Sequence, residues 1–352
     1  MIPPQMTGRF YTESSVNSGL RCTLCPHHCG LLPGKAGLCR VRWGGQKTPD
    51  KPEAPELPYY GYITALALDP VEKKPLYHWR PGSAILSAGF AGCNLRCPFC
   101  QNWRISQSTE APGRYRKPED LTEEAAASLC DQIAYTYSEP LVHAEYLLDC
   151  MKAARDKGFA NILVTNGCVS AEAAKVILSH TNAVNVDLKC FSQKTYSEVL
   201  GGDLWAVLDF IRLAVTMDVH TEITTLVVPG LNDGEKELTE IAEFIAGLAA
   251  GSGMDAAVPW HLSAYHPDWK WKTPVTNAAL LSARAARARK ILPYVYTGNI
   301  PGEHNDTHCP HCKAVLVQRR GYSIDTSGII LEKENGTVYR CAHCGKKAPI
   351  AG

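Results

Sequence analysis

The sequence predicts an α/β protein: an incomplete TIM-like barrel of parallel strands, with one small cysteine-rich module before it and another after it. Two observations carry this prediction. Between residues 83 and 299, short apolar runs alternate with helical segments, which is typical of right-handed β-α-β crossovers and a parallel sheet. The second observation concerns the 15 cysteines, because 11 of them gather in three groups, two of which flank the alternating region.

Seven apolar runs are the predicted strands, and six helical segments separate them. The segment 141–158 shows apolar residues at i, i+3 and i+4 and ends at a glycine, whereas residues 70–82 carry turn signals without a period. No GxGxxG motif follows the first strand, which disfavours a dinucleotide-binding fold. The strands span 83–90, 134–140, 161–167, 183–189, 220–230, 256–265 and 293–299; the helices span 121–133, 141–158, 171–180, 205–218, 235–251 and 277–292.

Three domains are predicted: a cysteine-rich segment with its linker (1–58), the barrel (59–300) and a four-cysteine ribbon (301–352). The linker is assigned to residues 46–58, which are rich in proline and charge. The net charge of +1 gives no reason to expect a nucleic-acid footprint or a polybasic membrane patch. No apolar run approaches the ~18 residues of a membrane span, and the first residues lack a signal-peptide pattern. We therefore expect a cytoplasmic protein.

The cysteines divide into grouped and isolated ones. Because the cytosol keeps thiols reduced, grouped cysteines there indicate metal rather than disulfides. The isolated ones have apolar or helical neighbours and are interpreted as small core hydrophobes. They are Cys130, Cys150, Cys168 and Cys190.

The central cysteine group, Cys93, Cys97 and Cys100, lies in the loop after the first predicted strand. Three thiolates at this spacing can each bind one iron of a [4Fe–4S] cube and leave the fourth iron open. An open coordination position is what separates catalytic metal sites from closed structural ones. Zinc is the alternative, but residues 101–103 (Gln-Asn-Trp) offer no good fourth ligand.

Polar or unusual residues stand where the later strands end. In β/α barrels the active site lies at the carboxyl ends of the strands, so these residues are expected to converge with the cysteine loop. They are Ser138-Glu139-Pro140, Thr165-Asn166-Gly167, Asp187 with Lys189, Pro229-Gly230 and His261.

The stretch CNLRCPFC (93–100), with Phe99 as its aromatic residue, resembles the C-x3-C-x-aromatic-C signature of radical S-adenosylmethionine (SAM) enzymes. More narrowly, the chain resembles the branch of pyruvate formate-lyase activating enzymes, and it looks closest to the radical SAM enzyme of the "AmmeMemoRadiSam system". The resemblance spans nearly the whole chain. It implies a (βα)6-type partial barrel in which the open iron of a [4Fe–4S] cluster binds SAM. Reductive cleavage of SAM then gives a 5′-deoxyadenosyl radical that abstracts hydrogen from a substrate. The segments that carry it are RCTLCPHHCGLLPGKAGLCRVR, LDPVEKKPLYHWRPGS, GCNLRCPFCQNW, TYSEP, VTNG, VDLK, VVPGLND, PWHLSAYHP, VYTGN and the terminal ribbon.

The resemblance also implies a SAM pocket. The segment TYSEP resembles the family's GGEP, with Tyr137 and Ser138 in place of two glycines. Val164 stands where the activating enzymes have an Asp, and Thr224 or Thr225 stands where the branch has a basic residue, so anchoring of the SAM carboxylate must differ. The implied cofactor-binding residues are Glu139, Pro140, Thr165, Asn166, Asp187, Lys189 and His261.

Two further metal sites are expected. Cys309, Cys312, Cys341 and Cys344 form two C-x2-C knuckles, with Asn335-Gly336 as a hairpin turn between them, and predict a closed site for zinc or rubredoxin-like iron. The N-terminal set leaves zinc and an auxiliary iron–sulfur cluster as alternatives, since thiolates suit both, and His27 or His28 can substitute for a ligand. That set is Cys22, Cys25, Cys29 and Cys39.

The sequence thus predicts a radical SAM enzyme with an unidentified substrate and an external one-electron reductant of the flavodoxin or ferredoxin type. Two alternatives stay open: an activase that installs a glycyl radical on a protein partner, and a non-catalytic iron–sulfur electron carrier. The resemblance further suggests a pathway shared with Memo-like and Amme-like proteins.

Overall fold

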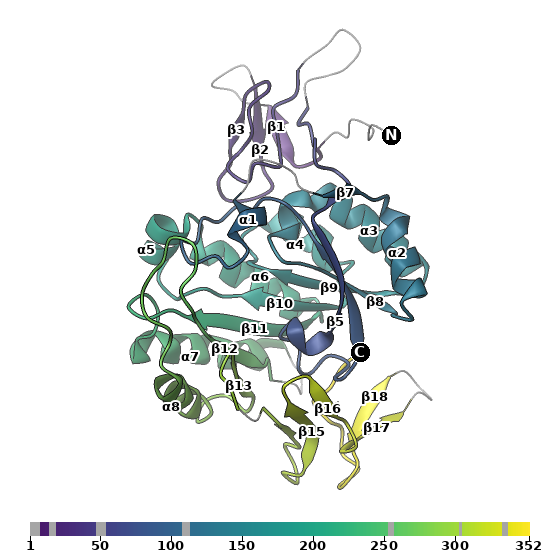
Figure 1. Ribbon diagram of the computed structural model, residues 1–352, viewed down its shortest axis with the longest axis vertical. Coiled ribbons are helices and arrows are strands. Elements are labelled where there is room, and N and C mark those ends of the chain that lie inside the picture. Colours follow the sequence, from purple (N-terminus) through teal and green to yellow (C-terminus); the bar gives the residue numbers. More distant parts are fainter. Residues whose placement is uncertain are drawn as a thin grey trace.

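An eight-stranded sheet forms the centre of the protein (Figure 1). The computed structural model describes residues 8–13, 19–46, 54–107, 113–252, 257–302, 305–332 and 337–352. Strand β6 and strands β8 to β13 pair in parallel, while β5 runs antiparallel to β6 and forms one edge. In order across the sheet, the strands are β13 (Val295–Gly298), β12 (Trp260–Ala264), β11 (His220–Val227), β10 (Ala183–Asp187), β9 (Ala160–Thr165), β8 (Gln132–Thr136), β6 (Ala84–Gly89) and β5 (Ala65–Pro70).

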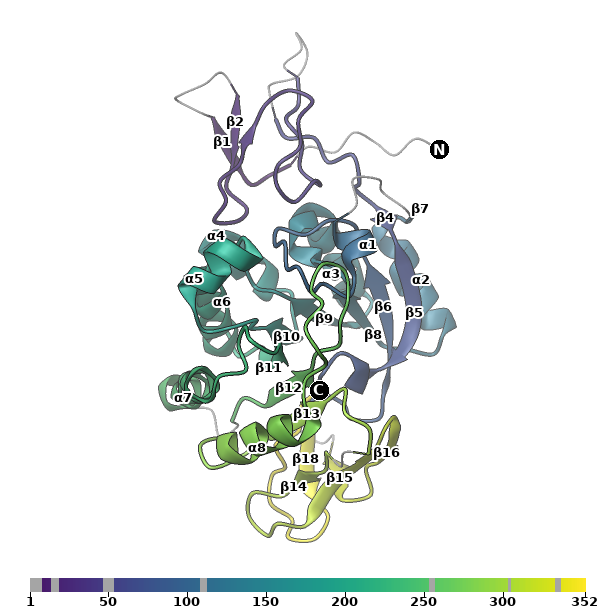
Figure 2. The same cartoon turned by 60° about the vertical axis from the view of Figure 1, so that its left-hand side comes forward.

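The sheet curves but does not close, since its order ends at β13 and β5 among the described residues. Helices lie along its outer side and pack on one another in sequence order (Figure 2). Within the described part of the chain, no helix is long and apolar enough to cross a bilayer. The α-helices are α1 (Trp103–Ser106), α2 (Pro118–Ala127), α3 (Ala144–Asp156), α4 (Ala171–Leu178), α5 (Gln193–Thr195), α6 (Leu204–Thr216), α7 (Glu235–Ser252) and α8 (Ala278–Ala288). Short 3-10 helices span Val71–Lys73 and Pro140–His143, and a π-helix spans Tyr196–Leu200.

Short strands form the two cysteine-rich parts, which lie at opposite ends of the molecule (Figure 1). The N-terminal sheet comprises β1 (Tyr11–Glu13), β2 (Leu20–Cys22) and β3 (Gly30–Leu31). The C-terminal part comprises β14 (Thr307–His308), β15 (Val315–Arg320), β16 (Ser323–Asp325), β17 (Ile329–Glu332) and β18 (Val338–Cys341); a separate pair joins β4 (Tyr62–Ile63) to β7 (Arg114–Tyr115).

The predicted incomplete barrel is confirmed, with all seven predicted strands present as parallel strands. The eighth strand, β5, was not predicted, because its residues carry turn signals close by and its own side chains are only half-buried. The helix predicted over 121–133 is too long. Helix α2 ends at Ala127 because Leu129 adopts a left-handed backbone (φ +52°), and Cys130 N–H then donates to the carbonyl of Ala125. The predicted turn at Asn335-Gly336 and most of the predicted linker, residues 47–53, lie outside the described residues.

The barrel floor, meaning the end of the sheet at which the parallel strands begin, is joined to the segment before β6 by a buried carboxylate. Glu222 on β11 is fully buried and accepts hydrogen bonds from the backbone N–H groups of Tyr77 and His78, at 3.0 and 2.7 Å. Its two oxygens also pair with the Nε2 atoms of His220 (3.0 Å) and His261 (2.7 Å), and these partners hold the pKa of Glu222 well below its usual range against the effect of burial. Four partners satisfy a charge that burial alone would make costly.

The C-terminal part packs against this floor. The Arg319 guanidinium donates to the carbonyl of Tyr77 (2.5 Å) and to the hydroxyl of Thr307 (2.8 Å), and it lies 4.3 Å from the centroid of the Tyr77 ring. The His78 ring bonds the carbonyl of Pro349 through Nδ1 and the hydroxyl of Tyr296 through Nε2. The ribbon is therefore a structural part of the barrel floor.

Unfolding should respond to pH through His143, a buried residue whose Nε2 lies 2.7 Å from the carbonyl oxygen of Ala91. Burial lowers the pKa of His143 from 6.5 to about 4, so below pH 6.5 the unfolded chain binds more protons than the folded one. The stability contributed by neutral His143 is thus present above pH 6.5 and is lost toward pH 4. We expect His143→Gln, whose amide can still donate to Ala91, to remove up to about 3 kcal/mol of the difference in unfolding free energy between pH 7 and pH 4. Urea unfolding of both proteins at the two pH values measures this; parallel pH curves would contradict it.

Candidate active site and metal centres

The three-cysteine loop follows β6 and is held from several sides. Gly92 has φ +81°, and a Cβ there would lie 2.5 Å from the carbonyl oxygen of Cys39, so only glycine fits this turn. The backbone N–H of Arg96 donates to the carbonyl of Leu200 (2.7 Å), and that of Lys270 donates to Pro98 (3.0 Å). The loop is thus positioned by the N-terminal module and by the segments after β10 and β12.

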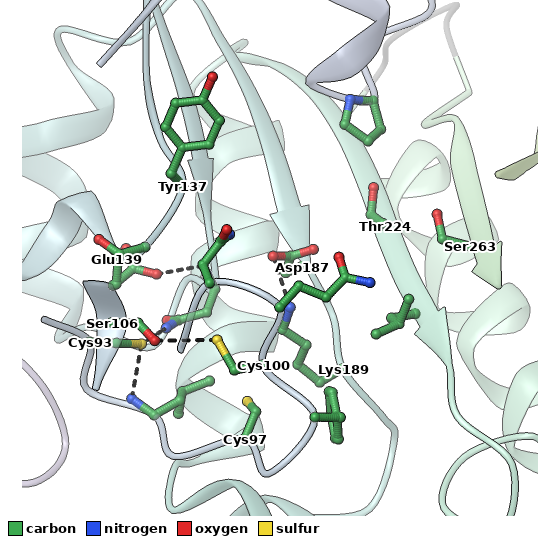
Figure 3. A pocket seen from close by; sticks show the side chains of 18 of the residues that line it. Cys93, Cys97, Cys100, Ser106, Tyr137, Glu139, Asp187, Lys189, Thr224 and Ser263 are labelled. Atoms are coloured by element: carbon green, nitrogen blue, oxygen red, sulfur yellow. Dashed lines mark hydrogen bonds and ion pairs between the residues drawn. The ribbon is translucent and has the colours of Figure 1, made fainter. Parts of the chain in front are cut away.

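The three thiols open onto one cavity of about 260 Å³ at the carboxyl ends of the parallel strands (Figure 3). Apolar side chains form part of its wall, and polar groups on or directly after six strands, β8 to β13, face it. The lining residues are Pro75, Cys93, Leu95, Cys97, Phe99, Cys100, Gln101, Asn102, Ser106, Tyr137, Ser138, Glu139, Asn166, Asp187, Lys189, Thr224, Leu226, Ser263 and Asn299.

Glu139 lies at one side of the cavity and is almost fully buried. Its Oε1 accepts hydrogen bonds from the Thr165 hydroxyl (2.6 Å) and from the backbone N–H of Leu141 (3.0 Å), and its Oε2 accepts from the backbone N–H of Asn166 (2.8 Å). Burial raises the pKa of Glu139 to about 7, although these three donors act to lower it. The carboxylate therefore joins the end of β8 to the end of β9.

Asn166 continues this network into the cysteine loop. Its Nδ2 donates to Oδ1 of Asn94 (3.0 Å) and lies 3.7 Å from the Cys93 sulfur, while Asn94 Nδ2 donates to the carbonyl of Cys168 (2.6 Å). These amides are buried. The position of Cys93 is consequently fixed by side chains that come from another strand end.

Opposite Glu139, Asp187 and Lys189 form an ion pair with 2.9 Å between Oδ2 and Nζ. Burial alone would lower the pKa of Lys189, but Asp187 and the thiols of Cys97 and Cys100 raise it above its ordinary value. A permanent ammonium beside the thiols suits a bound anion or an electron-rich cluster.

Tyr137 takes a backbone conformation that usually requires glycine, with φ +71°. Its hydroxyl donates to Oδ2 of Asp69 (2.6 Å), and the ammonium of the buried Lys74, itself 2.7 Å from Asp69, lies 4.6 Å from its ring centroid. A residue other than glycine therefore forms this left-handed turn, and its side chain adds an aromatic wall that is held by a buried ion pair on β5 and the turn after it.

Four of the seven residues expected to bind the cofactor line the cavity: Glu139, Asn166, Asp187 and Lys189. Pro140 and Thr165 are buried behind Glu139 and do not line it. His261 also does not line it, because its Nε2 bonds Glu222 and its ring packs against Tyr77 and Tyr296.

Sequence reasoning missed several polar wall residues, among them Ser106, whose hydroxyl lies 3.2 Å from the Cys100 sulfur, as well as Ser263 and Asn299. Thr224 faces the cavity with a buried hydroxyl that has no hydrogen-bond partner among the described residues. Ser263 follows His261 by two positions on β12, so the alternation of a strand could have identified it.

The C-terminal cysteines form a compact group. The sulfur atoms of Cys309, Cys312, Cys341 and Cys344 all lie within 4.8 Å of one another, with 3.7 Å between Cys309 and Cys344 and 3.6 Å between Cys312 and Cys341. Sulfurs at the corners of a zinc tetrahedron with 2.3 Å bonds are about 3.8 Å apart. This group fits one tetrahedral metal ion.

The N-terminal cysteines have a different geometry. Cys22, Cys25 and Cys39 are buried and Cys29 is half-buried. Among the described residues, only the C-terminal group has three or more ligand atoms that all lie within 4.8 Å of one another, so the N-terminal sulfurs are not gathered in this way. His27 is engaged elsewhere, with Nε2 2.7 Å from the carbonyl oxygen of Asn94. The four isolated cysteines are buried, as predicted.

The fold and the three-thiol cavity define a class of enzyme, and the comparisons agree with it. The sequence model described as "Radical SAM superfamily" matches residues 89–245. An uncharacterized protein of Methanocaldococcus jannaschii is 36% identical over 97% of this chain and 98% of its own length. Residues 89–245 therefore form a radical SAM domain, which implies a [4Fe–4S] cluster and SAM.

Within that superfamily the chain is homologous to pyruvate formate-lyase activating enzymes. It is 25% identical to that of Clostridium pasteurianum over 49% of this chain and 73% of the relative, and 25% identical to that of Escherichia coli over 52% and 75%. Among solved structures, SuiB of Streptococcus suis matches with a TM-score of 0.48 and 12% identity over 60% of this chain and 48% of its own.

Removing one C-terminal thiol should release the metal of that group. We expect Cys312→Ser to lower the metal content by about one equivalent per chain and the melting temperature by a few degrees, because the tetrahedral site loses a ligand beside the barrel floor. Elemental analysis and thermal unfolding measure this, with Cys130→Ala as a control that removes a thiol outside all three groups. Unchanged zinc and iron contents in Cys312→Ser would contradict the assignment.

Proposed function

We propose that this enzyme binds a [4Fe–4S] cluster at Cys93, Cys97 and Cys100 and cleaves SAM reductively in the adjoining cavity. The observation that carries the proposal is the convergence of three thiols and the Asp187–Lys189 pair on one cavity at the strand ends. Bound there, cluster and SAM supply the electron and the sulfonium whose cleavage yields a 5′-deoxyadenosyl radical able to abstract hydrogen.

The side chains of the cavity fit such an occupant. Lys189 lines the cavity and offers a cation to the SAM carboxylate. By the resemblance, the branch's usual basic residue is replaced here by Thr224 or Thr225. The hydroxyl of Thr224, which has no partner among the described residues, and that of Ser263 offer hydrogen bonds to a polar ligand.

Besides the contact with SAM that the resemblance implies, Glu139 has a positioning role. Both of its oxygens accept bonds from the protein, and through them it holds Asn166 and the cysteine loop in place. The apolar wall, which includes Leu95, Phe99 and Leu226, limits the access of water to a radical.

The decisive experiment is anaerobic reconstitution with iron and sulfide, followed by reduction with SAM present. We expect 5′-deoxyadenosine and methionine from the native protein, and at least a 100-fold lower yield from Cys97→Ala, which loses one cluster ligand. Cys130→Ala is the matched control and should retain the activity, since its thiol lies outside the cavity lining. Absence of 5′-deoxyadenosine from the native protein, or full activity of Cys97→Ala, would overturn the proposal.

A second candidate function is activation of a glycyl-radical enzyme, favoured by the similarity to pyruvate formate-lyase activating enzymes over about half of this chain. It requires a large protein substrate. Electron paramagnetic resonance of reaction mixtures separates the candidates: a glycyl radical on a partner supports activation, whereas a modified small molecule supports the first reading. The pathway shared with Memo-like and Amme-like proteins stays a prediction, and failure of all three to act on one series of metabolites would count against it.

A further inference from the structure

The N-terminal module is seated directly on the three-cysteine loop. The Cys39 carbonyl lies against Gly92, the residue before Cys93, and His27 Nε2 lies 2.7 Å from the carbonyl oxygen of Asn94, the residue after it. The Leu24 carbonyl accepts a hydrogen bond from Ser170 N–H (2.9 Å). Residues within the N-terminal cysteine segment, Cys39 and His27, therefore contact the three-cysteine loop just before and just after Cys93.

A backbone donor points at one of the N-terminal sulfurs. The N–H of Leu38 donates to the sulfur of the half-buried Cys29 at 3.4 Å. A sulfur that accepts an amide hydrogen bond is typical of a metal ligand, whereas a core hydrophobe has no such partner.

Arg42 supplies a second, independent observation. Its side chain is 1% exposed and forms an ion pair with Glu145 through Nη1 (2.7 Å), but Nε and Nη2 have no hydrogen-bond partner among the described residues. Cys22 and Cys39 both lie close enough to interact electrostatically with its guanidinium. Two buried N–H donors without an acceptor, close to thiols, indicate an anionic partner, because leaving a buried donor without a hydrogen bond costs free energy.

Four thiolates around a metal centre form such an anion, and the spacing distinguishes the two kinds of centre. The C-terminal sulfurs lie 3.6 and 3.7 Å apart in pairs and enclose one ion. Among the described residues, neither the N-terminal thiols nor those of Cys93, Cys97 and Cys100 form a group as close as the C-terminal one. A cluster of several irons needs ligands spread more widely than one ion does, since each sulfur binds a different iron.

We propose that Cys22, Cys25, Cys29 and Cys39 hold a second iron–sulfur cluster, which relays single electrons from an external protein donor to the cluster at Cys93, Cys97 and Cys100. The relay rests on the proposed function, whereas the second cluster does not. In each transfer the donor is oxidised by one electron and the second cluster is reduced; the second cluster then returns to its oxidised state as the first is reduced. No bond is made or broken and no proton moves.

Metal content tests the cluster on the full chain. Native protein reconstituted anaerobically should hold about eight sulfides and eight cluster irons, and the variant in which Cys93, Cys97 and Cys100 are all replaced by Ala should keep about four of each. One further iron is expected in every sample if the C-terminal group binds iron. The double variant Cys25→Ala/Cys29→Ala should likewise lose about four irons and four sulfides, while Cys130→Ala should lose none. Absence of sulfide from the Cys93/Cys97/Cys100 variant, with no iron beyond that of the C-terminal group, would overturn the proposal.

A spectroscopic measurement on the unmutated protein keeps the test valid if a variant misfolds. Reduced native protein should give two iron–sulfur signals in electron paramagnetic resonance, of which SAM shifts only one. A single signal, fully altered by SAM, would contradict a second cluster.

The relay is tested by comparing two reductants. For each protein we take the rate of SAM cleavage with reduced flavodoxin divided by the rate with dithionite, a small reductant that needs no docking site. This ratio should be at least tenfold lower in Cys25→Ala/Cys29→Ala than in native protein, and an unchanged ratio would rule out the relay. If native protein cleaves no SAM with either reductant, the proposed function fails while the iron counts still decide the second cluster.

Discussion

The cavity end of this barrel depends on the hydrogen bonds that the Glu139 carboxylate accepts. This carboxylate brings together three donors from two consecutive strand ends, and one of them, Asn166, passes the constraint on to Asn94 and hence to the loop of Cys93. Hydrogen bonds to a charged group contribute about 1.5–3 kcal/mol each, and removal of the acceptor would leave Thr165 and two buried N–H groups unsatisfied. A loop of eight residues that carries three thiols has little capacity to fix its own shape, so its geometry is imposed by neighbouring strands.

The architecture and the location of the site could be predicted from sequence because they follow from local pattern. Apolar runs separated by helical segments define parallel strands, and the rule that active sites lie at their carboxyl ends places Asp187, Lys189 and Glu139 beside the cysteines. What each side chain does there could not be predicted, because it depends on partners distant in sequence. His261 was expected at the cofactor, but Glu222 on the adjacent strand binds its ring nitrogen in the barrel floor. Likewise, β5 is identified as a strand by its antiparallel pairing with β6, which the local sequence pattern does not reveal.

Tyr137 shows how a left-handed turn without glycine is stabilised. A side chain at a left-handed position costs free energy that glycine does not, and the protein offsets this cost with a hydroxyl bond to Asp69 and a cation over the ring. The tyrosine gives the cavity an aromatic wall after β8 and links it to β5, the strand that lies outside the parallel series. The wall thus faces the same cavity as the three-cysteine loop.

The attachment of the ribbon to the barrel floor also has a consequence for the order in which the molecule is made. The hydrogen-bond partner of the Tyr77 carbonyl, Arg319, lies 242 positions later in the chain, and Pro349, the partner of the His78 ring, lies 271 positions later. During synthesis nearly all of the parallel sheet leaves the ribosome before these partners exist, so Tyr77 and His78 can be held at that stage by their bonds to Glu222 but not yet by the ribbon. Contacts of such separation slow the last stage of folding. The contacts between the ribbon and the barrel floor therefore form late, after the cysteines of the other two groups have been synthesised.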